Sequence, residues 1–207
     1  MKQVISVRIL GPSMSSDFGG FACYAYVIRD KEGHLPHEAF GLAEKANSQA
    51  SIASSSIATY TALIRALQWL IHHGYQDEII IVKSSSKSVV SQLDEAYPSS
   101  HQVTESRMPK SVIPLHEKAS RLKSKFYKIS FESVKSKSGK QSSSDSNEDP
   151  ADVEERKEIE ELLVMAYVEA EEKIMRQNRM LADQNSPFVT VAQLMKYDNN
   201  KKQVQTS

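Results

Sequence analysis

Several common protein features are scarce in this 207-residue sequence. It has one cysteine, Cys23, so the chain can form neither an internal disulfide nor a metal cluster held by several cysteines. No apolar run approaches the roughly 20 residues that cross a bilayer, and the first residues resemble a polar-flanked strand and not a signal peptide. These absences lead us to expect a cytoplasmic protein that does not span a membrane.

An excess of charge is also lacking, because Lys and Arg number 26 and so do Asp and Glu. A chain of zero net charge has no general attraction for a polyanion such as nucleic acid, so any such affinity must come from local patches. With 40% hydrophobic and 25% charged residues, the composition is typical of a soluble globular protein. We expect one domain over residues 1–178 and a charged, largely disordered tail over 179–207.

The apolar pattern predicts strands in the first fifth of the chain and then an alternation of helices and strands. Predicted strands cover residues 4–10, 21–28 and 37–43. The clearest predicted helix begins at the serines 54–56, which are good N-cap residues, and ends at Gly74. A continuous apolar strand over 78–82 and a short helix after the serines 84–86 complete a β-α-β unit with its following helix.

The second half of the chain contains one more helix and strand, an insertion, and a long helix. The helix is predicted over 112–122 and the strand over 126–131. Ser, Lys, Gly, Asn and Asp then dominate, which predicts a flexible insertion at about 135–152. A long helix follows from near Val153, with an apolar side that reaches at least Tyr167.

Five stretches in this order resemble motifs of the type 1 ribonuclease H family, especially its archaeal and bacterial forms. The first is the Gly-rich entry to the second strand, and the second is the third strand. The others are the start of the first helix, the serine-rich helix after the fourth strand, and the next helix along the chain. In this sequence they lie at 19–28, 41–45, 58–63, 85–93 and 113–119. The resemblance implies an α/β ribonuclease H-like fold, a mixed five-stranded sheet with flanking helices.

Enzymes of that family hydrolyse the RNA strand of an RNA–DNA hybrid with two magnesium ions, which four carboxylates hold. The resemblance places three of these carboxylate positions on Leu10, Thr59 and Ser85 of this sequence. An aliphatic side chain cannot bind Mg²⁺, and two neutral hydroxyls do not replace two charges, since Mg²⁺ prefers anionic oxygen ligands. The sequence therefore predicts a pseudoenzyme with no metal and no cofactor.

The fourth acidic position falls on either Asp152 or Glu160, because the insertion leaves the alignment open. Under either choice a single carboxylate remains, which does not make a two-metal site. A shifted register that uses Asp17 or Asp77 would restore an active, Mg-dependent hybrid ribonuclease, and this is the alternative function.

Two charged regions indicate partners. Basic residues that could contact phosphates gather between the predicted third helix and the strand after it. They are Lys110, Lys118, Arg121, Lys123, Lys125 and Lys128. The last helix is strongly acidic and would repel a polyanion, so it could instead bind a protein partner. We expect weak, sequence-independent binding of RNA–DNA hybrid or duplex nucleic acid, and a protein-interaction module is the other hypothesis. An ordinary solvated surface is the alternative explanation for each charged region, and it is the simpler one for the acidic helix.

Overall fold

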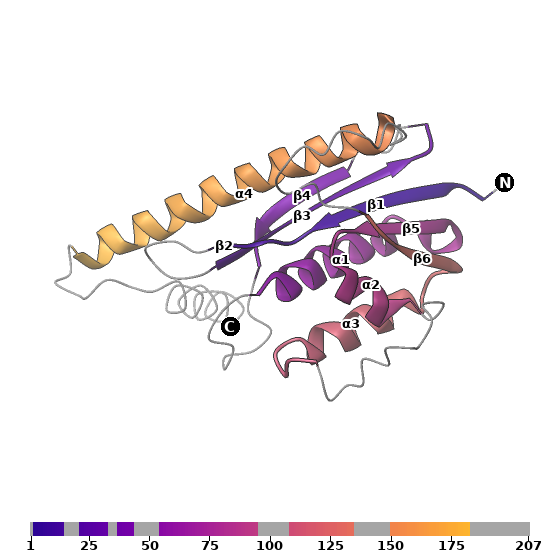
Figure 1. Ribbon diagram of the computed structural model, residues 1–207, viewed down its shortest axis with the longest axis horizontal. Coiled ribbons are helices and arrows are strands. Elements are labelled where there is room, and N and C mark those ends of the chain that lie inside the picture. The colour runs from indigo at the N-terminus through magenta and orange to yellow at the C-terminus, as the bar shows by residue number, and fades with distance from the viewer. Residues whose placement is uncertain are drawn as a thin grey trace, which may run out of the picture.

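A computed structural model describes residues 2–14, 21–32, 37–43, 54–94, 108–134 and 150–182 of the chain. A mixed sheet lies between two layers of helices (Figure 1). Its long strands are β1 (Val4–Leu10), β3 (Phe21–Asp30), β4 (His37–Leu42), β5 (Ile79–Ser84) and β6 (Lys128–Ser133). The predicted five-stranded mixed sheet is confirmed, and the short strand β2 (Ser13–Met14), which the sequence did not predict, continues the register of β1 along β3.

The sheet order is β2-β3-β1-β5-β6, with β4 paired to β3. β3 runs antiparallel to β1 and to β4, whereas β1, β5 and β6 are parallel. In this register Ile9 lies beside Ser84, and Ser84 lies beside Ser133. The carboxyl ends of the three parallel strands therefore meet at one edge of the sheet, where ligands commonly bind in open α/β folds.

One face of the sheet is covered by α1 (Ser55–His72), with α2 (Lys87–Leu93) and α3 (Ile113–Lys123) further out (Figure 1). Ser54 is the N-cap of α1, and its hydroxyl accepts a hydrogen bond from the Ile57 amide at 3.3 Å, as the serine run predicted. Alternate side chains of β1 and β5 meet the apolar side of α1 in a fully buried core. This part of the fold follows directly from period-2 and period-3.6 apolar patterns.

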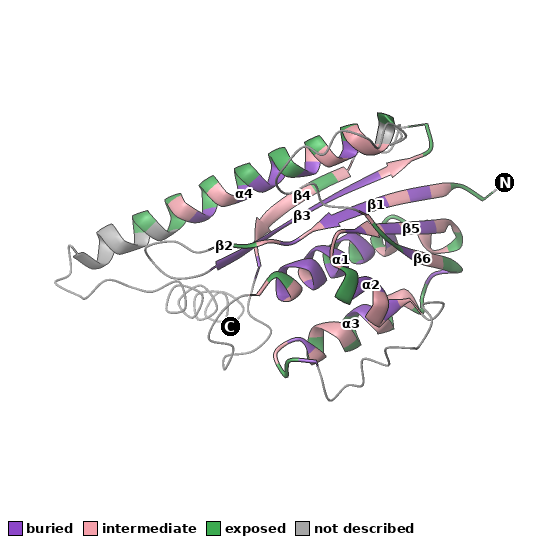
Figure 2. Cartoon of the chain, viewed as in Figure 1, coloured by how far each residue is buried: buried purple, intermediate pink, exposed green. Residues whose placement is uncertain are grey.

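The other face is covered by α4 (Pro150–Ala182), which lies across β3, β4 and part of β1 (Figure 1). Proline is favoured in the first turn of a helix because that turn needs no amide donor, and α4 begins at such a residue. Figure 2 shows a buried stripe along the inner side of α4 and exposed residues along the outer side. Side chains are buried as far as Ala170, three residues beyond the predicted minimum.

The predicted insertion and tail fall largely outside the described residues. Neither 135–149 nor 183–207 belongs to the described ranges, and residues 150–152 form the first turn of α4. The domain limits at 178 and 179 thus stay predictions. No helix in the described ranges combines the length and the apolar character that a membrane span requires.

Candidate functional site

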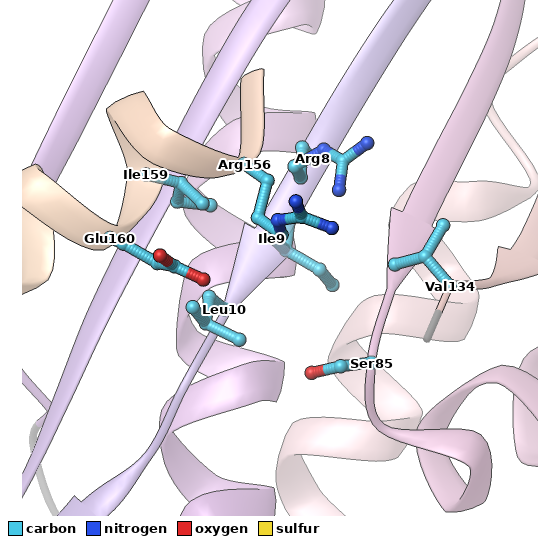
Figure 3. Close-up of a pocket in the computed structure, with 8 residues that line it drawn as sticks. All are labelled: Arg8, Ile9, Leu10, Ser85, Val134, Arg156, Ile159 and Glu160. Atoms are coloured by element: carbon cyan, nitrogen blue, oxygen red, sulfur yellow. The ribbon is translucent and has the colours of Figure 1, made fainter. Parts of the chain in front are cut away.

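A small pocket opens at the carboxyl ends of β1 and β5, under the first half of α4 (Figure 3). It brings together three positions that the sequence connected only through the family resemblance: Leu10, Ser85 and Glu160. Leu10 ends β1, Ser85 directly follows β5, and Glu160 lies on α4. The described residues that line it are Arg8, Ile9, Leu10, Ser85, Val134, Arg156, Ile159 and Glu160.

Thr59 lies close to this edge but does not line the pocket. A Cβ added at Gly11 would come within 2.2 Å of the Thr59 backbone nitrogen, so the end of β1 touches the first turns of α1 through a residue without a side chain. The Thr59 hydroxyl donates to the Ser55 carbonyl oxygen at 2.8 Å and is thereby turned toward its own helix. Glycine at position 11 is required by this close backbone approach.

The structure places the two remaining acidic positions differently. Glu160 borders the pocket, one helical turn beyond Arg156. Asp152 instead accepts hydrogen bonds from Arg8 at 2.8 Å and from Lys83 at 2.6 Å. The hydrogen bond from Lys83 and the charges of Lys83 and Arg8 hold the pKa of Asp152 below its usual value, against an opposing effect of burial.

Arg8 and Lys83 are neighbours across the parallel β1 and β5 strands and point to the face that α4 covers. The Arg8 side chain is only 7% exposed, and its Nε donates to Glu155 at 3.2 Å. Lys83 Nζ lies 3.8 Å from the same carboxylate. We call Arg8, Lys83, Asp152 and Glu155 the ionic layer, because these four side chains form one network between the sheet and the amino end of α4.

Sequence reasoning missed Arg8, Lys83 and Arg156 as members of this region. A signal was present, since Arg8 and Lys83 each stand near the end of an otherwise apolar strand, and parallel strands bring their ends together. Charged residues in buried strands are rarely tolerated without partners. The acidic residues on the first two turns of α4 are those partners.

The donor set of the pocket does not fit the two magnesium ions that the fold family implies. Among the described residues that line it, Glu160 is the one carboxylate, and the nearby carboxylates Asp152 and Glu155 are held by Arg8 and Lys83. No group of three or more His, Cys, Asp or Glu side chains in the described ranges could hold a metal ion. Of the shifted ligands, Asp77 precedes β5 and so lies at the opposite end of that strand, while Asp17 is outside the described residues.

The predicted nucleic-acid-binding residues lie on and around α3, which is on the opposite side of the molecule from α4 (Figure 1). Those exposed to solvent are Lys110, Lys118, Arg121, Lys125 and Lys128. Lys123 differs, because its Nζ donates to the Leu93 carbonyl oxygen at 2.7 Å and so completes the end of α2. A cation is favoured at a helix carboxyl end, which gives Lys123 a structural role.

Lys123 and Lys128 also border a larger groove between α2, α3 and the start of β6. This groove lies at the amino end of β6, since Lys128 pairs with Ile79. The pocket at Leu10 and Ser85 lies at the carboxyl ends of the same parallel strands. The two cavities are therefore at opposite ends of the parallel strands.

The strand order and the helices on both sides of the sheet define the class: an α/β protein with a ribonuclease H-like fold. A family model described as reverse transcriptase-like matches residues 19–140, and the chain belongs to this family. The matched part contains Thr59 and Ser85 but neither β1 nor α4. The sequence-based assignment to the ribonuclease H-like group is confirmed.

Several solved structures are similar to this chain. The solution structure of the PFV RNase H domain matches 81% of this chain and 95% of that chain, with a TM-score of 0.54 and 12% identity. RNase H1 from Halobacterium salinarum matches 64% of this chain and 86% of its own, with a TM-score of 0.48 and 21% identity. LC11-RNase H1 in complex with an RNA/DNA hybrid matches 63% of this chain and 85% of its own, with a TM-score of 0.47 and 22% identity. No curated protein gives a significant match.

Proposed function

We propose that this chain is a ribonuclease H-like nucleic-acid-binding protein that binds RNA–DNA hybrid or duplex backbone and does not cleave it. The observation that carries this proposal is the pocket, in which Leu10 and Ser85 replace carboxylates and Glu160 stands alone. We assign the remnant acidic position to Glu160, because Asp152 is held by Arg8 and Lys83. Two-metal hydrolysis needs several carboxylates around the reacting phosphate, and the described residues that line the pocket supply one.

The exposed basic residues around α3 support the binding part of the proposal. Five of the six predicted positions are exposed to solvent, so their charges can reach a phosphate backbone laid against this side of the molecule. Interactions of this kind act on the phosphates and do not depend on base sequence. Lys123 is left out of the binding set because of its bond to Leu93.

Cleavage and binding of one labelled RNA–DNA hybrid test the proposal. We expect binding at low salt and no cleavage in Mg²⁺ or Mn²⁺, with affinity that falls steeply as the salt concentration rises. Cleavage that Glu160→Gln abolishes would overturn the pseudoenzyme and favour the active alternative. Absence of binding even at low salt would overturn nucleic acid as the partner.

A matched pair of variants tests the location of the binding surface. Lys118→Gln with Lys125→Gln removes two exposed charges beside α3, whereas Lys31→Gln with Lys157→Gln removes two exposed charges elsewhere. The first pair should reduce the slope of log affinity against log salt by about 0.9 for each phosphate that is no longer neutralised, and the second should not. Equal effects of the two pairs would show that net charge alone governs binding.

Protein binding by α4 is a second candidate function, and one observation favours it. The outward side of α4 carries exposed apolar residues, namely Val164, Met165, Val168 and Met175. Apolar groups in one solvent-exposed stripe are typical of interaction surfaces. Loss of a stoichiometric partner in Val168→Glu, but not in the Lys118/Lys125 variant, would favour this function over nucleic-acid binding.

A further inference from the structure

Positively charged side chains lie at the pocket beside Leu10 and Ser85. Arg8 and Arg156 both line it, and Lys83 lies next to Arg8 on the neighbouring strand. We propose that this pocket is a metal-independent phosphate site, in which the guanidinium group of Arg156 faces the nucleic-acid backbone in place of divalent cations. The inference rests on the proposed function, because it assumes that the chain binds nucleic acid.

The carboxylates that a metal ion would need at this edge are already held by side-chain cations. A divalent cation here would bind the anionic oxygens on the first turns of α4. Asp152 accepts hydrogen bonds from both Arg8 and Lys83, and Glu155 is 3.2 Å from Arg8. A metal ion would have to displace these cations and would be repelled by them at short range. The ionic layer therefore excludes divalent cations by occupying their ligands.

The other polar groups of the pocket suit a phosphate. Figure 3 shows the Arg156 guanidinium projecting from α4 toward the pocket, with the Ser85 hydroxyl on the strand side. A guanidinium has five N–H donors in a planar fork that matches two oxygens of a phosphate. It can add a phosphate to the partners that it already has in the protein. A serine hydroxyl supplies one further donor.

The phosphate site depends on the charge of Arg156. Asp152 and Glu155 compensate the charges of Arg8 and Lys83, and Arg156 and Glu160 are the other charged residues among the described lining. Ion pairs with Asp152 and Glu155 fix the position of the Arg8 side chain. Glu160 is exposed and lies one turn from Arg156 on the same helix. Its charge opposes a phosphate, so a phosphate site and a metal site predict opposite effects when Glu160 is neutralised.

The experiment measures hybrid binding by fluorescence anisotropy at low salt, with the full chain, in EDTA and in Mg²⁺. The variants are Arg156→Gln, Arg156→Lys and Glu160→Gln, and Lys157→Gln is the control because Lys157 is exposed on the adjacent position of α4. We expect equal or tighter binding in EDTA than in Mg²⁺. Arg156→Gln should weaken binding about tenfold, which is the usual size for losing hydrogen bonds to a charged group. Glu160→Gln should tighten binding, and Lys157→Gln should change it less than either.

The alternatives give distinct results. Binding that needs Mg²⁺ and is lost in Glu160→Gln would overturn the inference and indicate a metal site. Equal effects of Arg156→Gln and Lys157→Gln would overturn it while leaving the proposed function standing, provided that the Lys118/Lys125 variant still weakens binding. No binding by the unaltered chain would overturn both. Arg156→Lys keeps the positive charge but lacks the planar guanidinium donors, so it can be used for the same test if Arg156→Gln does not fold. Arg156→Lys should bind the hybrid more weakly than the unaltered chain.

Discussion

The two faces of the sheet meet their helices differently along β1. Toward α1, the side chains of β1 are Ile5, Val7 and Ile9, all buried in an apolar core. Toward α4, the same strand presents Ser6 and Arg8, and the contact with the helix is ionic where β1 and β5 meet. Further along α4 the contact with β3 is apolar as well, so the α4 face combines an apolar cluster with an ionic layer, whereas the contact of β1 with α1 depends on the shape of apolar side chains.

The α4 face also carries the less complete set of polar contacts. In the described part of the chain, the buried side-chain polar atoms without a hydrogen-bond partner are Ser6 Oγ and Arg29 Nε, and both residues point toward α4. Arg29 nevertheless pairs with Glu158 through its Nη2. A buried polar atom without a hydrogen-bond partner costs free energy. These two atoms therefore reduce the net stabilisation that polar contacts give to the α4 face. Four variants, taken in order of decreasing effect, test this difference between the faces.

Arg8→Leu should produce the largest loss. It removes the central cation of the ionic layer and leaves Glu155, 9% exposed, without its closest partner. Breaking a buried ion pair from one side costs about 4 kcal/mol of unfolding free energy. Urea denaturation would measure it, with Ile9→Val on the opposite face as the control at about 1 kcal/mol. A loss for Arg8→Leu no larger than that of the control would contradict the importance of the ionic layer.

Gly11→Ala tests the face that depends on shape. The added Cβ would meet backbone atoms of Ala58 and Thr59 that cannot rotate away, the nearest at 2.2 Å. We expect a loss of about 3 kcal/mol from overpacking. In Gly41→Ala the new atom would meet the end of the Tyr24 side chain at 3.3 Å, so the loss should be smaller. Thermal unfolding would compare the stability losses of the two variants. A larger loss for Gly41→Ala than for Gly11→Ala would mean that α1 shifts easily to make room for the new Cβ.

Asp152→Asn tests the pH dependence of the ionic layer. The pKa of Asp152 is lowered in the folded chain, so its stabilisation is fully present above its unfolded pKa of about 3.9 and is lost as the pH falls through the lower folded pKa. The variant should be about 1 kcal/mol less stable at neutral pH, a modest figure for a partly exposed ion pair. The difference should shrink below about pH 4.

Unfolding curves from pH 7 to pH 3 would show this dependence. Asp77→Asn, on an exposed residue at the other end of β5, serves as the control. A difference between Asp152→Asn and the unaltered chain that stays constant down to pH 3 would argue against ionised Asp152 as the cause.

Glu172→Gln should have the smallest effect. Glu172 pairs with Arg176 at 2.7 Å on α4, but the two side chains are 57% and 72% exposed. An exposed helical pair of this type contributes about 0.3 kcal/mol. Chemical denaturation should barely distinguish the variant from the unaltered chain. A loss near that of Arg8→Leu would mean that exposure does not separate the two kinds of ion pair in this protein.

The contrast between the faces also explains what the sequence could and could not predict. The apolar face was predictable, because strands and helices with regular apolar spacing, such as β5 and α1, determine their own packing. The position of α4 against the sheet was only partly predictable, since it depends on which charges meet. Leu10 and Ser85 were placed together by resemblance, and the structure does bring them to one pocket.

The ionic layer could not be predicted, because it joins residues about 70 and 150 positions apart by pairings that no local pattern encodes. The sequence could not decide between Asp152 and Glu160 for the same reason. Both lie on one helix, and only the crossing of that helix over β1 decides which of them reaches Arg8. Lys123 was grouped with binding residues for its charge, whereas its contact with Leu93 depends on how α2 ends.

The register that places Arg8 beside Lys83 has a consequence for the order of folding. Two like charges on adjacent strands repel each other when the strands pair. The carboxylates that compensate them stand on α4, far along the chain from β1. During synthesis, β1 and β5 are complete well before Asp152 and Glu155 have been added. We therefore expect the centre of the sheet to reach its full stability only when α4 docks, so that β1, β5 and α4 fold as one cooperative unit.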